Sequence, residues 1–239
     1  MNPFILSFQA KSLDAAIHKH SAFQIVISHD GSFHARLDNE DNKDIFGFIV
    51  KPQIPHSCRE NTNLLSIINI EPFSPVGVFI ERLFRPGVNY IPFKGKNEIF
   101  NYLPIEPTGN LEKSINQIAS INHSPSKLDE RITSIINYIH LNYAQKLNLK
   151  ILSNLVHLSP SRLSSLFKGQ TGSSLSRYIL WTRIRHAIHL SLSTKKTQLT
   201  DIAFQTGFYD LPQLNKYMYD MIGVPPKGFR NNSDLIQVL

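Results

Sequence analysis

Two short stretches of the chain place histidines at regular spacing beside residues typical of strands. The stretch "HKHSAFQIVISHDG" has the pattern H-x-H-x3-Q-x6-G, which begins at His18, and "GFIVKPQIPH" has G-x4-P-x3-H, which ends at His56. Imidazole nitrogens can hydrogen-bond to one another, line a pocket for an organic ligand, or bind divalent transition ions such as Zn, Fe, Ni or Cu. The spacing alone leaves these three kinds of chemistry open.

The net positive charge of the chain lies entirely in its second half. Residues 1–126 contain 11 Lys and Arg against 12 Asp and Glu, a net charge of −1, whereas residues 127–239 contain 14 against 6, a net charge of +8. A basic domain beside a neutral one is typical of a phosphate-binding module joined to a domain with another task. A surface that only improves solubility could carry the same net charge, so charge alone does not distinguish a phosphate-binding domain from a merely soluble one.

The composition predicts a globular protein of two domains. The chain has 239 residues, of which 41% are hydrophobic and 18% are charged. Its apolar runs are too short for a bilayer, and its first residues lack the features of a secretory signal. The single cysteine, Cys58, excludes an internal disulfide and suits a reducing compartment. We therefore expect a cytoplasmic protein without a membrane segment.

Short strands are expected to position the histidines of the first half. Runs of β-branched and aromatic residues separated by turn residues predict strands at 23–28, 31–37, 45–51, 64–70 and 88–93. No long helical pattern separates the first four runs. The first domain, residues 1–95, is therefore predicted to be an antiparallel β sandwich or small barrel.

From Lys96 onward the periodicity becomes helical. Residues 96–103 and 110–121 have helical spacing, and the polar stretch "NHSPSK" interrupts it at 122–127. We interpret 96–127 as a helical connector and linker. The apolar stripe at 110–123 could pair between two chains or pack within its own chain, so a monomer and a homodimer both stay open.

Residues 128–239 are predicted to form an all-α domain, which makes the whole chain α+β. An amphipathic helix is expected at 128–143, Asn148 can cap a helix at 149–156, and Ser159 can cap the next helix, with Pro160 at its first position. After a long helix at 174–193, a second pair of helices follows at 198–222, with its turn at Gly207. The long helix, of roughly 18 residues, would span about 27 Å. That length would let two recognition helices enter successive major grooves, about 34 Å apart.

The helical half resembles the double helix-turn-helix domain of AraC/XylS-type transcriptional regulators over residues 128–231. The resemblance rests on "LSPSRLSSLFKGQTGSSLSRYI", "RIRHAIHL", "IAFQTGFYDLPQLNKYM" and "GVPPKGFR", which occur in this order. It implies double-stranded DNA as a partner and implies DNA-facing positions in both units, namely Ser159, Pro160, Ser161, Arg162, Ser164, Ser165 and Lys168 in the first and Tyr209, Leu211, Pro212, Gln213, Asn215 and Lys216 in the second.

This chain departs from the family in ways that affect base recognition. Ser165 stands where the family often has arginine, and a serine cannot make a bidentate contact to guanine. In the second unit, Leu211 and Pro212 offer only apolar contact, for example to a thymine methyl group. We therefore expect the second unit to read little sequence and the first to discriminate more.

The first half is similar to the cupin-like sensor domains found in such regulators. Both histidine stretches match the two cupin signature stretches, and "NIEPFSPVG" resembles a segment common in these sensors. The resemblance implies that His18, His20, Gln24 and His56 converge inside the barrel. They could bind a small-molecule effector or a divalent transition metal. Metal-binding cupins often have glutamate where this chain has Gln24, so the resemblance favours an organic effector or hydrogen-bonded histidines over a metal.

The sequence thus predicts a DNA-binding transcriptional regulator that responds to a small-molecule effector. RNA polymerase is a further candidate partner. No catalytic residues and no required cofactor are predicted. The alternative is a metal-dependent cupin enzyme fused to a regulatory DNA-binding module, against which the incomplete ligand set argues. A repair protein that methylates its own cysteine is disfavoured because Cys58 has no second thiol near it in sequence.

Overall fold

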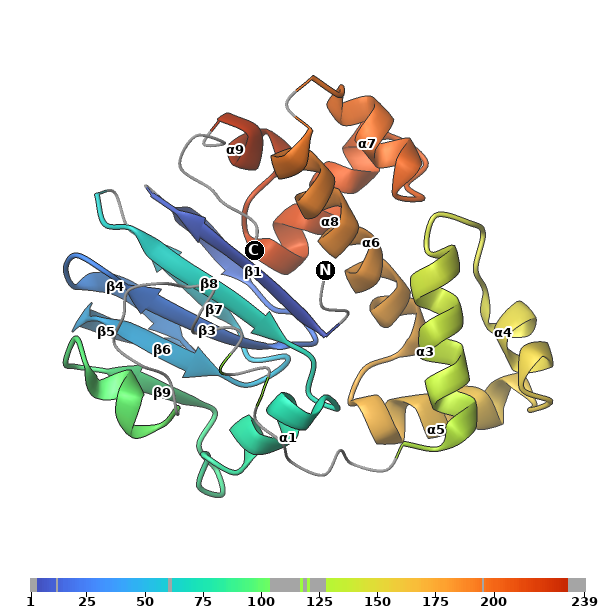
Figure 1. Cartoon of the computed structure of the whole chain (residues 1–239), viewed down its shortest axis with the longest axis horizontal. Helices are drawn as coiled ribbons and strands as arrows, with labels where there is room; N and C mark the ends of the chain where they lie inside the picture. The colour runs from blue at the N-terminus through green and yellow to red at the C-terminus, as the bar shows by residue number, and fades with distance from the viewer. Residues whose placement is uncertain are drawn as a thin grey trace.

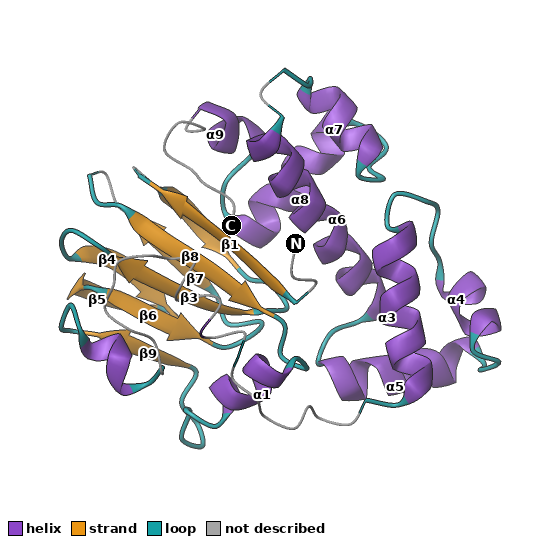
Figure 2. Cartoon of the chain, in the orientation of Figure 1, coloured by secondary structure: helices purple, strands orange, loops and turns teal. Residues whose placement is uncertain are grey.

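The computed structural model describes residues 4–11, 13–59, 62–103, 117, 120, 128–194 and 196–231. The strands gather in one half of the molecule and the long helices in the other, as Figures 1 and 2 show. This is the α+β arrangement that the sequence predicts. Among the described residues, no helix has both the length and the apolar character needed to cross a membrane.

Two antiparallel sheets make up the strand-rich half (Figure 1). The five-stranded sheet has the order β1 (Ile5–Ala10), β8 (Leu65–Ile70), β3 (Phe23–Ser28), β6 (Gly47–Val50) and β9 (Tyr90–Phe93). The four-stranded sheet has the order β2 (Asp14–His18), β7 (His56–Arg59), β4 (Phe33–Leu37) and β5 (Glu40–Ile45).

The five-stranded sheet is buried on both faces. On β3, Val26 packs toward the second sheet in one apolar cluster, while Phe23 and Ile25 pack on the opposite face. That opposite face is covered by α1 (Pro75–Glu81) and by the 3-10 helix η1 (Glu98–Asn101). Because side chains alternate along a strand, Gln24 lies on the same face as Val26, between the two sheets.

Each of the five predicted strand runs contains an observed strand, but β1, β2, β5, β7 and helix α1 were not predicted. Strand β5 has the sequence "EDNKDI" and lies at the edge of its sheet, where exposed positions tolerate charge and leave no apolar run to detect. The helix expected at 96–103 is only the short η1. Nearly all of the predicted helix at 110–121 and the linker at 122–127 lies outside the described residues, so the domain boundaries stay predictions.

The helical half contains two helix-turn-helix units joined by one long helix. The first unit follows α3 (Glu130–Asn142) and consists of α4 (Leu149–Leu155) and α5 (Pro160–Thr171). Helix α6 (Leu175–Ser193) then leads to the second unit, α7 (Leu199–Gln205) and α8 (Leu211–Ile222), and to α9 (Pro226–Asn231). The predicted caps are present, because Asn148 accepts from the Ile151 amide at 2.9 Å and Ser159 from the Arg162 amide at 3.3 Å.

One apolar cluster crosses from the sheets into the helical half. It contains Leu6, Phe8 and Val26 from the strands together with Trp181 and Ile184 from α6. At its edge the ring of Phe8 meets that of Phe229, with 5.5 Å between centroids. The helical half is therefore packed against the sheets by a continuous hydrophobic core.

A buried carboxylate lies in the same interface. Oε1 of Glu71 accepts hydrogen bonds from Nε1 of Trp181 at 2.8 Å and from Nη1 of Arg185 at 3.3 Å, and all three side chains are buried. Burial raises the pKa of Glu71, and the nearby Arg185 guanidinium opposes this change. Glu71 therefore depends on these two residues of α6 to remain charged inside the protein.

We predict that Arg185→Met lowers the free energy of unfolding at neutral pH by about 3–5 kcal/mol, because it leaves the Glu71 carboxylate buried without a counter-charge. Without Arg185 the pKa of Glu71 rises further, so this loss should shrink as the pH falls and the carboxyl group becomes protonated. Denaturant unfolding at two pH values measures both effects. The double variant Glu71→Gln with Arg185→Met keeps an acceptor for Trp181 and should recover most of the stability. A double variant no more stable than Arg185→Met would contradict this account.

Candidate functional site

Three histidines meet between the two sheets, close to the helical half. His18 and His56 are register partners on β2 and β7, and their ring centroids lie 4.2 Å apart. The register of β2 shifts between Ala15 and His18, where one extra residue forms a bulge. A bulge re-aims the side chains that follow it, and here His18 is buried beside His56.

His20 and Gln24 complete the set predicted from the sequence. The His20 ring lies 5.1 Å from that of His56 and 5.8 Å from that of His18. Nε2 of Gln24 is 3.2 Å from Nε2 of His20 and donates to Oδ1 of Asn69 at 3.2 Å. Sequence reasoning missed Asn69, although a polar residue within the apolar run "LLSIINI" was a usable signal.

The hydrogen bonds of His18 and His56 fix the roles of their ring nitrogens. Nδ1 of His18 is 2.8 Å from the Ala16 carbonyl, and Nδ1 of His56 is 2.8 Å from the Ile54 carbonyl. Nδ1 must therefore carry the proton in each neutral ring, which leaves Nε2 as a free acceptor. Among the described residues, neither Nε2 atom has a hydrogen-bond partner, and neither does Nδ1 of His20.

Burial disfavours the protonated form of all three rings. Burial lowers the pKa of His56 to about 4. Burial also holds the pKa of His18 and that of His20 well below the usual value for histidine, and the neighbouring His56 lowers both further. One nitrogen from each of the three rings lies within 4.8 Å of the others. The unpartnered Nε2 atoms of His18 and His56 are therefore acceptors, whereas Nε2 of His20 accepts from Gln24 and the unpartnered Nδ1 of His20 carries the proton of that ring.

An aromatic residue of the helical half covers this cluster. The indole of Trp181 on α6 stacks on His20, with 5.2 Å between centroids and 19° between the ring planes. Trp181, the one tryptophan of the chain, belongs to none of the motifs that the sequence offers for a site in the first half. No local pattern marks a residue that contacts its partner from more than 150 positions away.

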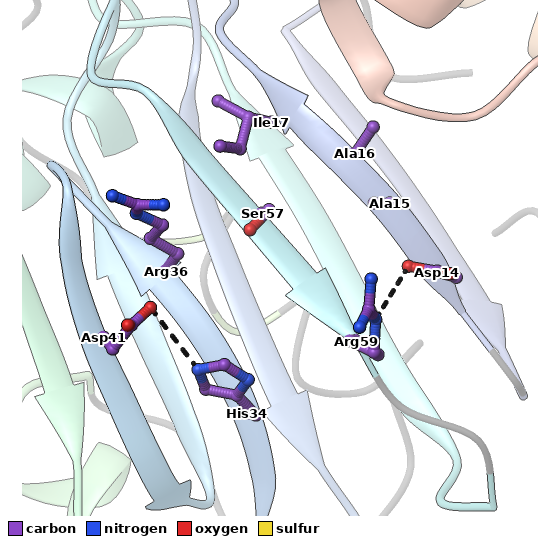
Figure 3. Close-up of a pocket in the computed structure, with 9 residues that line it drawn as sticks. All are labelled: Asp14, Ala15, Ala16, Ile17, His34, Arg36, Asp41, Ser57 and Arg59. Carbon is purple, nitrogen blue, oxygen red and sulfur yellow. Dashed lines mark hydrogen bonds and ion pairs between the residues drawn. The ribbon is translucent and has the colours of Figure 1, made fainter.

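A pocket lies on the outer face of the four-stranded sheet (Figure 3). Four of its residues form two pairs, Asp14 with Arg59 at 3.3 Å and His34 with Asp41 at 3.6 Å. Because side chains alternate along β2 and β7, this face is opposite to the one that carries His56. We assign no ligand to this pocket.

The DNA-facing residues predicted in the first unit lie at its surface. Ser159, Pro160, Ser161, Arg162, Ser165 and Lys168 are exposed, and Ser164 is half-buried. Leu163 and Phe167, predicted to be core residues, are completely buried in the cluster beneath α5. Helix α5 therefore presents a polar face to solvent and an apolar face to α3 and α6.

The second unit presents its predicted residues in the same way, with one difference. Tyr209 is 81% exposed, Pro212 and Lys216 are exposed, and Leu211, Gln213 and Asn215 are half-buried. Oε1 of Gln213 accepts from the Tyr209 amide at 2.9 Å, while Asp210 accepts from the Gln213 amide at 2.8 Å. The pair resembles a capping box in which Gln213 accepts from the residue before the cap, Asp210, and this bond fixes the direction of the Gln213 side chain.

The two units are held in a fixed relation by α6. Arg183 donates from Nε to the Tyr143 carbonyl and from Nη2 to the Gln145 carbonyl, each at 2.8 Å, and so ties α6 to the loop before α4. Gly207, in the turn of the second unit, lies against the same loop, where an added Cβ atom would come within 2.9 Å of the Tyr143 oxygen. Its φ of +82° also favours glycine.

Comparisons with known proteins concern both halves. A family model described as a helix-turn-helix domain matches residues 152–232. The HTH-type transcriptional regulator YobQ of Bacillus subtilis is 27% identical over 225 residues, which cover 90% of this chain and 88% of that protein. An HTH-type transcriptional regulator of Staphylococcus aureus is 31% identical over 104 residues, and this match spans only 14% of that relative's length.

Solved structures share the complete fold. ToxT from Vibrio cholerae, crystallised with an unsaturated fatty acid, aligns with a TM-score of 0.56 over 95% of this chain and 94% of its own, at 13% identity. ToxT bound to a methylnaphthalenyl butenoic acid gives 0.57 over 96% and 98%, also at 13% identity. At this identity the likeness establishes the arrangement of sheets and helices and nothing further.

Proposed function

We propose, from the premise that the C-terminal half is an AraC-type helix-turn-helix domain, that the chain is a transcriptional regulator with two DNA-reading helices. The observation that carries this proposal is the pair of exposed polar faces on α5 and α8, held in fixed relation by α6. The net charge of +8 on residues 127–239 supplies attraction to phosphates. Because its target is chromosomal DNA, we place the protein in the cytoplasm.

The two units would contribute differently to DNA binding. Helix α6 has 19 residues and spans about 28 Å at ~1.5 Å per residue, close to one turn of B-DNA. In α5, Ser161, Arg162 and Ser165 offer hydrogen-bonding groups to base edges. In α8, Leu211 and Pro212 offer apolar contact and Lys216 offers a charge. We therefore assign most base discrimination to the first unit and mainly positioning to the second.

The His18, His20 and His56 cluster is our candidate for the effector site, with a divalent transition ion as its occupant. Three buried imidazoles with one nitrogen each within 4.8 Å of the others would fit such an ion, provided that His20 exchanges its hydrogen bond from Gln24 for the metal or moves its ring proton. The carbonyls of Ala16 and Ile54 orient two of the rings, as outer partners of metal-binding histidines do. Gln24 hydrogen-bonds to His20 and Asn69 and carries no negative charge, so the ion would be held by neutral ligands alone.

Other readings of the chain have less support. ToxT is named as bound to a fatty acid, and an organic effector remains the second candidate for this domain. The alternative of a metal-dependent cupin enzyme draws no support from the relatives, which are named as transcriptional regulators. Contact with RNA polymerase and the choice between monomer and homodimer stay predictions from the sequence.

The full chain should bind double-stranded DNA with an affinity that falls linearly with the logarithm of salt concentration, by about 0.9 log unit per log unit of salt for each phosphate contact. Titrations at several salt concentrations, with DNA from rounds of in vitro selection, measure this slope and the selected site. Binding that neither responds to salt nor selects any site would refute the proposed function.

Substitutions should separate phosphate binding from base reading. Lys216→Ala should weaken binding about equally for all sequences and reduce the salt slope by about 1, whereas Ser161→Ala or Arg162→Ala should change the preferred base. The matched control is Lys51→Ala, which removes a lysine of the sheet half paired with Glu81 at 2.9 Å and should leave DNA binding unchanged. If Asn215→Ala reduced selectivity more than any change in α5, the roles of the two units would be reversed.

Protein purified without chelators should contain close to one divalent transition ion per chain. His56→Ala should abolish this content because it removes one of three ligands, whereas His34→Ala, a control on the outer face of the sheet, should retain it. Elemental analysis by mass spectrometry gives the stoichiometry. Traces of metal far below one per chain, or equal loss from both variants, would exclude the metal and leave the organic effector.

A further inference from the structure

A cavity of about 490 Å³ lies between the two helix-turn-helix units, and we call it the inter-unit cavity. Its walls come from residues 147–149 at the start of α4, from the first half of α6, from Phe208, and from Gln213 and Tyr217 on α8. Every residue that lines it belongs to the helical half, so it is separate from the histidine cluster between the sheets. Its volume falls within the range of roughly 300–1,000 Å³ that is typical of small-molecule sites.

Two arginines line the inter-unit cavity, and within the described part of the chain no acidic residue does. Nη2 of Arg177 donates to the Lys19 carbonyl at 2.8 Å, but its Nε is buried without a hydrogen-bond partner among the described residues. Arg183 donates only to backbone carbonyls. Neither guanidinium forms an ion pair with a described residue. Partly buried cations without a counter-charge favour an anion beside them.

The surroundings of Arg183 differ from those of an arginine that has a counter-charge. Burial lowers the pKa of Arg183. Arg131, at the start of α3, pairs with Asp129 at 2.6 Å, and the hydrogen bond and charge of Asp129 raise the pKa of Arg131. An anion in the inter-unit cavity would stabilise the charged form of Arg183 as Asp129 stabilises that of Arg131.

Much of the remaining wall is apolar. Leu149 and Leu180 supply aliphatic surface, and Phe208 and Tyr217 supply two rings whose centroids lie 6.3 Å apart. An inorganic ion would leave this surface in contact with water, whereas an apolar group would cover it. Apolar walls with a few polar or charged groups that fix the orientation are typical of sites for small organic molecules.

We propose that the inter-unit cavity binds a small organic monoanion, a carboxylate on an apolar body, and that this anion and DNA exclude each other. The carboxylate would pair with Arg177 and Arg183, and the body would lie against Leu180 and Tyr217. Gln213, which the sequence predicts to face DNA, lines the same cavity, so an occupant would lie beside the DNA. It would also cancel positive charge that otherwise attracts phosphates. The exclusion rests on the proposed function, whereas binding of the anion does not.

Three probes separate the charge of the ligand from its apolar body. Phenylbutanoate has both, phenylbutanol has the body without the charge, and acetate has the charge without the body. We expect phenylbutanoate to bind the full chain about tenfold more tightly than either of the others, because a hydrogen bond to a charged group contributes about this factor. Equilibrium dialysis without DNA measures the three dissociation constants.

Substitutions then test the position of the site. Ser176 is exposed, lines the cavity, and lies in the first turn of α6, where an acidic side chain stabilises a helix. Ser176→Glu places a carboxylate of the chain itself beside the arginines and should abolish phenylbutanoate binding, whereas the neutral Ser176→Gln, of equal size, should retain most of it. Arg177→Met should lose the preference for phenylbutanoate over phenylbutanol. Arg131→Met, which removes an arginine already paired with Asp129, should keep this preference.

A selected DNA site tests the exclusion. Phenylbutanoate at ten times its own dissociation constant should raise the apparent dissociation constant for DNA about elevenfold, the value for complete exclusion. Phenylbutanol at the same concentration should leave DNA binding unchanged.

The results separate this inference from the proposed function. Phenylbutanoate that binds no better than phenylbutanol and acetate overturns the inference and leaves DNA binding intact. Loss of binding in Ser176→Gln or Arg131→Met equal to that in Ser176→Glu or Arg177→Met overturns it, as does phenylbutanoate that binds without weakening DNA binding. If no probe binds and Arg177→Met reduces the salt slope of DNA binding by about 1, the cavity holds a DNA phosphate instead. If the chain binds no DNA, the proposed function fails, and dialysis alone decides whether the cavity holds the anion.

Discussion

The buried contact between Glu71 and helix α6 is the constraint on which the relation between the two halves depends. A buried carboxylate must be paired and hydrogen-bonded, and Oε1 of Glu71 finds both partners on successive turns of α6, at Trp181 and Arg185. These two contacts fix which face of α6 meets the sheets. That choice places the indole of Trp181 over His20. Since Arg183 on the same helix holds the first unit, the position of Glu71 also determines where the DNA-reading helices lie relative to the histidine cluster.

The bulged segment of β2 makes two different contacts. The extra residue between Ala15 and His18 lets His18 face its partner His56 between the sheets, while the backbone of Ala16 remains free to bond with Gly223. Strand β2 lies at the edge of its sheet, so a backbone amide that points away from β7 has no strand partner and can bond elsewhere. This short segment thus joins the interior of the sheet half to the end of α8.

Sequence reasoning succeeded where the signal is local and failed where it is not. The caps Asn148 and Ser159, the glycine turn at Gly207 and the apolar stripes define the helices, and the structure has them where they are predicted. The histidine spacing also identified residues that the fold brings together. Strand β5 escaped prediction because an edge strand can be highly charged. Glu71 and Trp181 escaped it because they are 110 positions apart and meet only when the two halves pack.

The same distinction applies to the DNA-facing surface. Exposure of the predicted residues follows from helical periodicity and could be inferred from the sequence. The hydrogen bond from the Tyr209 amide to the Gln213 oxygen could not be anticipated from a resemblance alone, although the order of Asp210 and Gln213 is a capping pattern. This bond holds the first turn of α8 and engages an oxygen that could otherwise accept a hydrogen bond from a base. Both effects agree with a helix that positions the protein more than it reads bases.

Hydroxyl-radical footprinting of the full chain on a selected DNA site tests the central idea of two rigidly braced reading helices most directly. The account predicts two protected segments about one helical turn, or 10–10.5 base pairs, apart on the same face of the duplex. A single protected segment, or two segments on opposite faces, would contradict it.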